Sequence, residues 1–396
     1  MTRRGQQQRN MARRSQQKAS ASADAPKRRR PRGGGGGSAA AADAATAAAP
    51  TLCTPRRYQL LAGLAAEPGS AAVGGTCLTA AEVSAVAAAV GVADAGDGRA
   101  GAGGGGGSSS SRGGNSGRNS RRREGAGDGL LRRLHAALGT RPGEEWRWSA
   151  ASSSSRPAAT AAIRDPALRA AIGAAYRPPQ PRAWRRKPRD WLGNDDLEAV
   201  MRQYAEAYPR FRFVGVFPRD FAARTLPLGR CVSPPMCALS ARALLDAGQS
   251  EFGAIINLDT HRGDGSHWVA VYGCVARRPG RFGLWYYDSL GRPPLPEVAA
   301  LHAALRAGVG SALGAPAARA FGLRHNPVRK QFQNTECGIY AMLFIVACLT
   351  TRLSFDAICT QLMRGDDETH RLRAVFYRPS DDPPPPAPPP ARTAPG

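Results

Sequence analysis

The run "CGIYAMLFIVACLT", Cys337–Thr350, is apolar on almost every face. A helix of this composition has no polar stripe to turn toward water, so the run predicts a helix buried in the middle of a folded domain. Its apolar stretch is too short to cross a bilayer. The rest of the chain must therefore supply layers of structure around this helix.

Hydrophobic periodicity from about Arg185 onward predicts such layers. The segment "WLGNDDLEAVMRQYAEAYP" predicts an amphipathic helix with Asn194 as its N-cap. Runs rich in β-branched and aromatic residues predict strands at "FRFVGVFP", "FGAIINLDT", "HWVAVYGCVA", "FGLWYYDSL" and "FGLRHNPV". Further helices are expected over about 296–313, 355–363 and 366–376. These elements predict one α+β domain.

The first half of the chain has a different composition. Ala, Gly, Ser and Arg dominate as far as about Gln180, in runs such as "GGGGGSAAAADAATAAAP". Such segments bury too little apolar surface to offset chain entropy. Two weakly apolar patches predict short helices that do not make a core alone. We expect a mostly disordered arm over 1–184, a folded domain over 185–378 and a proline-rich tail over 379–396.

Charge separates the same two halves. The chain has a formal net charge of +25, and 32 basic against 12 acidic residues lie up to Asp190. A basic arm of this kind favours nucleic acid through counterion release. The run "PKRRRPR", Pro26–Arg32, also suits a nuclear import signal. The alternative is a solubilising tail that reflects a biased genome composition.

The ends and the cysteines predict an intracellular protein. The N-terminus has charges but no apolar core of a signal peptide, and no membrane partner is expected. The eight cysteines form no C-x-x-C pair, and the spacing of Cys231 and Cys237 does not suit a metal. We expect buried, reduced thiols, with Cys53 and Cys77 free in the arm. No metal and no cofactor are predicted.

A cysteine at the start of a helix is a candidate nucleophile. Backbone N–H groups and the helix dipole stabilise a thiolate at Cys337, and Gly338 lets the backbone approach a substrate. His267 in "GDGSHWVAVY" is the candidate base, and Asp288 in "LWYYDSLG" is the candidate orienting carboxylate. Gln331 could donate its amide N–H to an oxyanion. Each residue alone suits an ordinary structural role, but their joint order is hard to produce by chance.

Four segments carry a resemblance to a known family: "WLGNDDLEAVM", "GAIINLDTHRGDGSHWVAVY", "YYDSLG" and "QFQNTECGIYAMLFI". Over Trp191–Tyr377 the chain resembles the ubiquitin-like-protein-specific (SUMO) cysteine proteases and their viral relatives. These relatives include the adenoviral maturation protease and the polyprotein proteases of large DNA viruses. The resemblance implies a papain-like α+β fold with a central mixed sheet between helices and the nucleophile at the start of the central helix.

The resemblance also assigns roles by motif position. Cys337 would be the nucleophile, His267 the base, Asp288 the orienting carboxylate and Gln331 the oxyanion donor. Gln333 is close enough in sequence to leave the last assignment open, although the family's spacing favours Gln331.

The expected substrate-binding residues are Trp191, Trp268 and Gly338. In such enzymes a tryptophan-lined tunnel excludes side chains, so a Gly-Gly-type site would precede the cut. A viral precursor processed in the virion or host cell is the favoured substrate, and a SUMO or ubiquitin-like conjugate is the second candidate. Self-cleavage at "RGGGGGS" or "AVGGTC" would also be possible. The chain could instead be a non-catalytic module that binds ubiquitin-like proteins, a nucleic-acid-packaging protein or an acyltransferase.

Overall fold

The computed structural model describes residues 52–57, 76–93, 129–149, 163–225, 227 and 229–380. Two compact units divide the chain: one comprises residues 48–179, and the other includes all described residues from Gln180 onward. The basic run Pro26–Arg32 and nearly all of the proline-rich tail lie outside the described residues. Each unit is described by itself below.

A five-stranded mixed sheet forms the middle of the C-terminal unit, in the order β1-β4-β5-β6-β7. Strands β1 and β4 are parallel, as are β6 and β7, whereas β5 runs antiparallel to both of its neighbours. The strands span Phe211–Pro218 (β1), Glu251–Asn257 (β4), Trp268–Cys274 (β5), Gly283–Tyr287 (β6) and Leu323–His325 (β7). Every residue of β4, β5 and β6 is buried, because helices cover both faces of the sheet.

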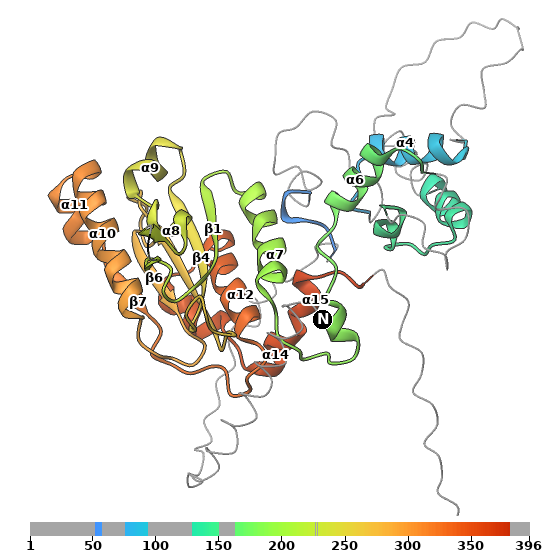
Figure 1. The fold of residues 1–396 in the computed structure, drawn as a ribbon. Helices are drawn as coiled ribbons and strands as arrows, with labels where there is room; N and C mark the ends of the chain where they lie inside the picture. The colour runs from blue at the N-terminus through green and yellow to red at the C-terminus, as the bar shows by residue number, and fades with distance from the viewer. Residues whose placement is uncertain are drawn as a thin grey trace, which may run out of the picture. The chain divides into compact units, whose positions relative to one another are not determined.

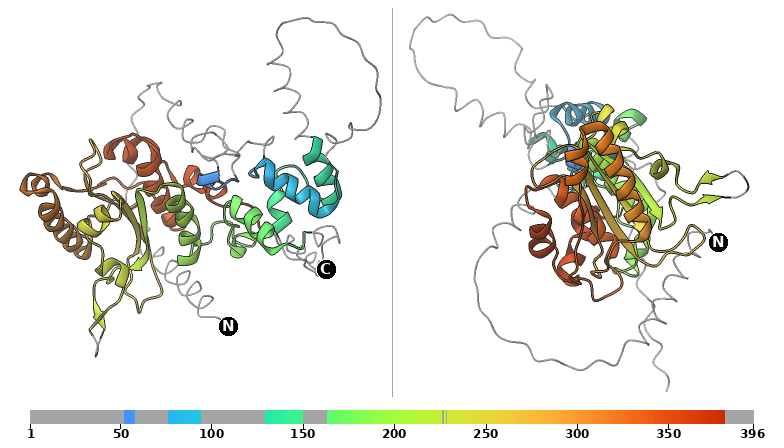
Figure 2. Two further views of the ribbon diagram at one scale, coloured as in Figure 1. Left: turned by 90° about the horizontal axis from the view of Figure 1, so that it is seen from above. Right: turned by 90° about the vertical axis from the view of Figure 1, so that its left-hand side faces the viewer.

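Helices pack on the two faces in two separate cores (Figures 1 and 2). One face carries α8 Pro234–Cys237, α9 Ala241–Asp246, α10 Pro296–Leu313 and α11 Ala315–Ala320. The other carries η3 Arg182–Arg185, α7 Asn194–Ala207, α12 Cys337–Thr350, α13 Phe355–Ala357, η4 Ile358–Leu362, α14 Asp366–Arg371 and α15 Arg373–Phe376. A short hairpin of β2 Arg224–Thr225 and β3 Arg230–Cys231 completes the unit. The predicted α+β fold with helices flanking a mixed sheet is confirmed.

Helix α12 is the central helix that the apolar run predicts. It begins at Cys337, and ten of its residues are buried. Gly338 lets this helix approach the segment before α7, since a Cβ at that position would lie 3.0 Å from Leu192 Cδ1. The position of a cysteine at the start of the buried helix is therefore fixed by packing on several sides.

The start of α7 differs from the prediction. Gly193, not Asn194, is the N-cap, and the backbone N–H of Gly193 donates to Asp196 Oδ2 at 2.8 Å. The carboxylate three residues into the helix satisfies the cap position, so Asn194 becomes the first helical residue. Its side chain is thereby released from capping.

The unit over 48–179 contains α4 Ala80–Val90, a helix over 129–138, η1 Glu145–Ser149 and α6 Pro166–Ala175. Leu78, Val86, Leu134, Trp148 and Ile172 lie in one buried core. The two apolar patches of the arm do form helices, and they share this core with segments that composition alone did not single out. Where the structure describes the predicted arm, the chain is folded.

The prediction of free thiols is wrong for four of the eight cysteines. Cys53 pairs with Cys77, and Cys231 pairs with Cys237. The fold brings the two members of each pair close together, which sequence spacing did not reveal. The four free cysteines are Cys274, Cys337, Cys348 and Cys359, and all of them are buried.

Across the described ranges, no helix has the length and apolar character needed to cross a membrane.

Candidate active site

The candidate residues gather at one edge of the sheet. Strands β1, β4, β6 and β7 end at this edge, and β5 begins there, because β5 runs antiparallel to its neighbours. His267 directly precedes β5, and Asp288 directly follows β6. The strand register pairs Ala270 with Tyr287, and this alignment brings the side chains of His267 and Asp288 next to each other.

His267 lies between a carboxylate and a thiol. Its Nε2 is 2.6 Å from Asp288 Oδ1, and the Cys337 thiol lies near enough to the imidazole to influence its pKa. Burial alone lowers the pKa of His267, but the interactions with Asp288 and Cys337 outweigh burial and raise the pKa to about 9. An imidazole with this pKa holds its proton at neutral pH, and a protonated imidazole stabilises a neighbouring thiolate.

The Asp288 carboxylate is held on one side only. Its Oδ1 accepts hydrogen bonds from His267 and from the Leu290 backbone N–H, the latter at 2.8 Å. In the part of the chain that the structure describes, its buried Oδ2 has no hydrogen-bond partner. Few other groups therefore bond the Asp288 carboxylate, so its negative charge acts mainly on the imidazole and favours the protonated form of His267.

Asn326 fixes the backbone of Asp288, and sequence reasoning missed it. The amide of Asn326 accepts from the Asp288 N–H at 3.0 Å and donates to the Asp288 carbonyl oxygen at 2.8 Å. Asn326 follows β7, so this pair of bonds ties the ends of two neighbouring strands together. An isolated asparagine after a short strand gives no signal of this role in the sequence.

The two glutamines that sequence spacing left open lie in different environments. Gln331 is buried, and its Oε1 accepts from the Ser289 hydroxyl at 2.6 Å. With the oxygen so occupied, the NH₂ end of the amide is the end available to a ligand. Gln333 is exposed, and its Oε1 accepts from Arg189 at 2.9 Å. Gln331 is thus the one that bonds the residue next to Asp288.

A buried ion pair anchors the residue before Cys337. Glu336 is fully buried, and its carboxylate accepts from Arg373 Nε at 2.8 Å. The same guanidinium donates to the carbonyl oxygens of Pro188, Asp190 and Thr335. The ion pair therefore ties the start of α12 to the segment before α7. Sequence reasoning missed this pair, because its members lie on different elements.

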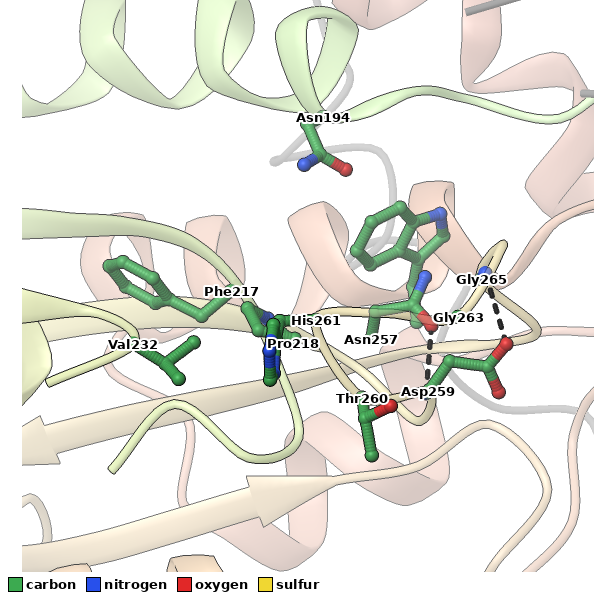
Figure 3. A pocket seen from close by; sticks show the side chains of 11 residues that line it. Asn194, Phe217, Pro218, Val232, Asn257, Asp259, Thr260, His261, Gly263 and Gly265 are labelled. Carbon is green, nitrogen blue, oxygen red and sulfur yellow. Dashed lines mark hydrogen bonds between the residues drawn. The ribbon is translucent and has the colours of Figure 1, made fainter. Parts of the chain in front are cut away.

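A cavity of about 210 Å³ is lined by Trp268, the residue that follows His267 in the chain (Figure 3). Its walls come from the ends of β1 and β4, the loop before β5, the residue after Cys231 and the start of α7. Asn194 extends from α7 toward the cavity, opposite Asn257 and Asp259. Asn257 and Asp259 are fixed by hydrogen bonds from backbone N–H groups. The cavity combines apolar walls with amide and carboxylate groups.

The three predicted substrate-binding residues lie at different depths. Trp268 lines the cavity, is 2% exposed and donates its indole N–H to the Leu192 carbonyl oxygen at 3.1 Å. Trp191 is partly exposed and does not line the cavity. Gly338 is buried, and its close approach to Leu192 explains why this position holds a glycine without any contact with a substrate. Among the described residues, no three His, Cys, Asp or Glu side chains group as metal ligands do.

Comparison with known proteins agrees with the motifs. No family model matches the chain. A curated relative, "Putative thiol protease R355" of Acanthamoeba polyphaga mimivirus, is 27% identical over 195 residues, which are 48% of this chain and 58% of the relative. The chain is similar to a viral thiol protease. The resemblance predicted from the sequence is confirmed, although the chain spans little more than half the length of this relative.

Two solved structures were also found to be similar. The ASFV pS273R protease is 18% identical, with a TM-score of 0.47, and the match covers 64% of this chain and 90% of that one. The C-terminal Ulp1 protease domain, solved in complex with Smt3, the yeast orthologue of SUMO, is 19% identical, with a TM-score of 0.32. That match covers 48% of this chain and 76% of the other.

Proposed function

We propose that this chain is a cysteine peptidase in which Cys337 is the nucleophile and His267 the general base and acid. The observation that carries the proposal is the placement of His267, which hydrogen-bonds Asp288 and lies near enough to Cys337 for the thiol to raise its pKa. The name and sequence similarity of the mimivirus relative support the same activity.

The proposed reaction begins with Cys337 as a thiolate and His267 protonated, the state that the raised pKa of His267 favours. The thiolate attacks the substrate carbonyl carbon, and a C–S bond forms as the carbonyl oxygen becomes an oxyanion. As the oxyanion collapses, the C–N bond breaks and His267 gives its proton to the leaving amine. His267 then takes a proton from water, the resulting hydroxide attacks the thioester carbon, and the C–S bond breaks to release the carboxylic acid and restore the Cys337 thiolate beside protonated His267. Asp288 holds the imidazole in orientation and stabilises its protonated form throughout.

Gln331 and the Cys337 backbone N–H are the proposed oxyanion donors. The Ser289 hydroxyl fixes the amide oxygen of Gln331, so its NH₂ group is preorganised as a donor. Because α12 begins at Cys337, the first N–H groups of this helix lack carbonyl partners within it. A negatively charged oxygen near these groups gains from both donors and from the helix dipole.

The proposed substrate has small residues, of Gly-Gly type, before the cleaved bond. Cys337 is 2% exposed and His267 is 7% exposed, so a substrate must reach them through a narrow opening. The buried Trp268 beside His267 narrows this approach further. A chain segment without side chains meets the least steric resistance there.

Maturation of viral precursor proteins is the proposed role. The viral origin of the curated relative supports it. A ubiquitin-like conjugate is the second candidate substrate, because the motifs around His267 and Cys337 resemble those of SUMO proteases. The basic first half of the chain is proposed to hold the protein near nucleic acid, on the strength of its charge.

The deciding experiment is hydrolysis of a fluorogenic peptide ending in Gly-Gly, with and without DNA. The wild-type protein is expected to cleave it and Cys337→Ala to be inactive. Cys359→Ala, which alters another buried free thiol, is the matched control and should retain activity. Cleavage by Cys337→Ala would contradict the proposal. A rate that does not respond to DNA would remove the role of the basic segment while leaving the peptidase assignment intact.

A further inference from the structure

Large apolar side chains are exposed at three positions within the described residues: Leu313 at 37%, Val328 at 52% and Phe332 at 70%. Single exposed apolar residues are common on protein surfaces and carry no meaning by themselves. Two of these three, however, lie on the connection between β7 and α12, which also carries Gln331. Phe332 directly follows Gln331 in the chain.

Hydrogen bonds hold the backbone of this connection on both sides of Gln331. The N–H groups of Lys330 and Gln331 donate to the Ser289 carbonyl oxygen at 2.8 and 3.0 Å. The N–H groups of Phe332 and Gln333 both donate to one oxygen of Asp366 at 2.8 Å. Phe332 therefore projects from a fixed backbone.

The ring of Phe332 is also supported by a cation. The guanidinium carbon of Arg329 lies 5.0 Å from the ring centroid, within the range of a cation–π contact. Arg329 Nε donates to the Gln331 carbonyl oxygen, so the guanidinium is itself held in place. One face of the aromatic ring is thus supported while the side chain stays mostly open to solvent.

The sheet order places the cavity and the start of the connection that carries Phe332 on opposite sides of the candidate catalytic pair. The cavity lies at the ends of β1 and β4 and the start of β5. His267 and Asp288 lie at β5 and β6, and the connection that carries Phe332 leaves β7. A substrate segment that crossed the candidate catalytic pair with one end at the cavity would run toward the β7 end of this connection with the other end.

We propose that Phe332, flanked by Val328, contacts an apolar side chain of the substrate on the leaving-group side of the cleaved bond. This inference rests on the proposed peptidase function, in which the segment before the cut lies beside Trp268. An apolar side chain that covers the exposed ring removes both from water. The substrate class is therefore a protein chain with small residues before the cut and an apolar residue shortly after it.

The test compares two internally quenched peptides with the same Gly-Gly sequence before the cut. One peptide carries Leu and the other Ser at each of the first three positions after the cut. The wild-type protein is expected to favour the Leu peptide in kcat/KM by about tenfold, the effect of a modest hydrophobic contact. Phe332→Ala should bring this ratio close to one, and Phe332→Leu should restore part of it.

Leu313→Ala is the matched control, because it removes another exposed apolar side chain at the end of α10, on the opposite face of the sheet from α12. It should keep the wild-type ratio, and circular dichroism should show that all variants are folded. An unchanged ratio in Phe332→Ala overturns the inference, even if both peptides are cleaved. Cleavage of neither peptide by the wild-type protein overturns the proposed function and the inference with it. A wild-type dimer that becomes monomeric in Phe332→Ala assigns the ring to a second copy and also overturns the inference.

Discussion

Each of the two units contains a buried histidine whose Nε2 hydrogen-bonds a buried carboxylate. In the C-terminal unit His267 pairs with Asp288 at 2.6 Å, and in the other unit His135 pairs with Glu145 at 2.9 Å. Both histidines are less than a tenth exposed. The pair itself is therefore the same chemical arrangement in two places.

The third partner separates the two pairs. His267 also lies near enough to Cys337, a thiol at the start of a helix, for the thiol to raise the pKa of the imidazole. His135 instead bonds the Thr140 hydroxyl at 2.8 Å, and that hydroxyl accepts from the Trp148 indole N–H. A hydroxyl already engaged by a tryptophan stabilises a fold but offers no nucleophile. A histidine–carboxylate pair therefore suits catalysis only when the third group beside the histidine can act as a nucleophile.

The two carboxylates also differ in how many hydrogen-bond partners they have. Although burial raises the pKa of Glu145, the hydrogen bonds from His135, from backbone N–H groups and from Tyr176 outweigh burial and lower the pKa. Both oxygens of Glu145 have partners, including the Tyr176 hydroxyl at 3.0 Å. Asp288 keeps one oxygen that has no partner within the described residues. Several partners therefore share the charge of Glu145, whereas the charge of Asp288 acts mainly on His267.

Replacing each histidine by alanine gives the largest expected contrast. His267→Ala should lower kcat/KM for a Gly-Gly peptide by about 10⁴-fold or more, since removal of a catalytic base is this costly. His135→Ala should leave cleavage near wild type but destabilise the unit over 48–179 by about 3 kcal/mol, because buried Glu145 loses its partner. Peptide kinetics and thermal unfolding measure the two effects. Loss of cleavage in both variants at a temperature where both are folded would break the distinction.

Replacing the carboxylates without changing their shape should give a smaller contrast. Asp288→Asn should reduce kcat/KM by about 10³-fold, because an amide cannot stabilise the imidazolium. Glu145→Gln should reduce stability by about 1–3 kcal/mol through mismatched hydrogen bonds and leave catalysis unchanged. Steady-state kinetics and urea denaturation separate these outcomes. Full activity of Asp288→Asn would contradict the orienting role.

The proposed oxyanion donor gives a further contrast, because Gln331 hydrogen-bonds Ser289, the residue that follows Asp288. Gln331→Ala should lower kcat by about 10²–10³-fold, the cost of removing one oxyanion donor. Gln333→Ala is the matched control two residues away, and its kcat should stay within about twofold, as is usual for exposed substitutions. Equal losses in the two variants would show that the loop backbone, rather than the Gln331 amide, matters.

The pH dependence should give the smallest effect. The pKa of His267 is raised from 6.5 to about 9, so its contribution to stability is complete below pH 6.5 and lost as pH rises through about 9. The shift corresponds to about 3 kcal/mol. Activity should fall on the alkaline side near pH 9, and Asp288→Asn should move that fall to lower pH. Unfolding free energies and pH–rate profiles test both points; a flat stability curve between pH 6.5 and 9 would contradict them.

Local patterns were enough to predict much of the catalytic unit. The apolar run predicted α12, and the aromatic and β-branched runs predicted β1, β4, β5, β6 and β7, because side-chain burial repeats with the period of each element. The order of His267, Asp288, Gln331 and Cys337 suggested the candidate site, because strand ends and helix starts hold side chains in defined directions. The elements follow from short local segments, whereas this order spans the whole catalytic-domain motif.

Contacts between distant segments were beyond such patterns. Asn326 bonds Asp288 across 38 residues, Glu336 meets Arg373 across 37, and Cys53 reaches Cys77 across 24. The sequence also did not reveal the core of the first half, because weakly apolar segments from several places in the chain build it jointly. The sequence by itself determined the elements and the order of the chemical groups. Tertiary structure alone decided which groups meet, because burial and hydrogen bonding depend on distance in space and not on distance along the chain.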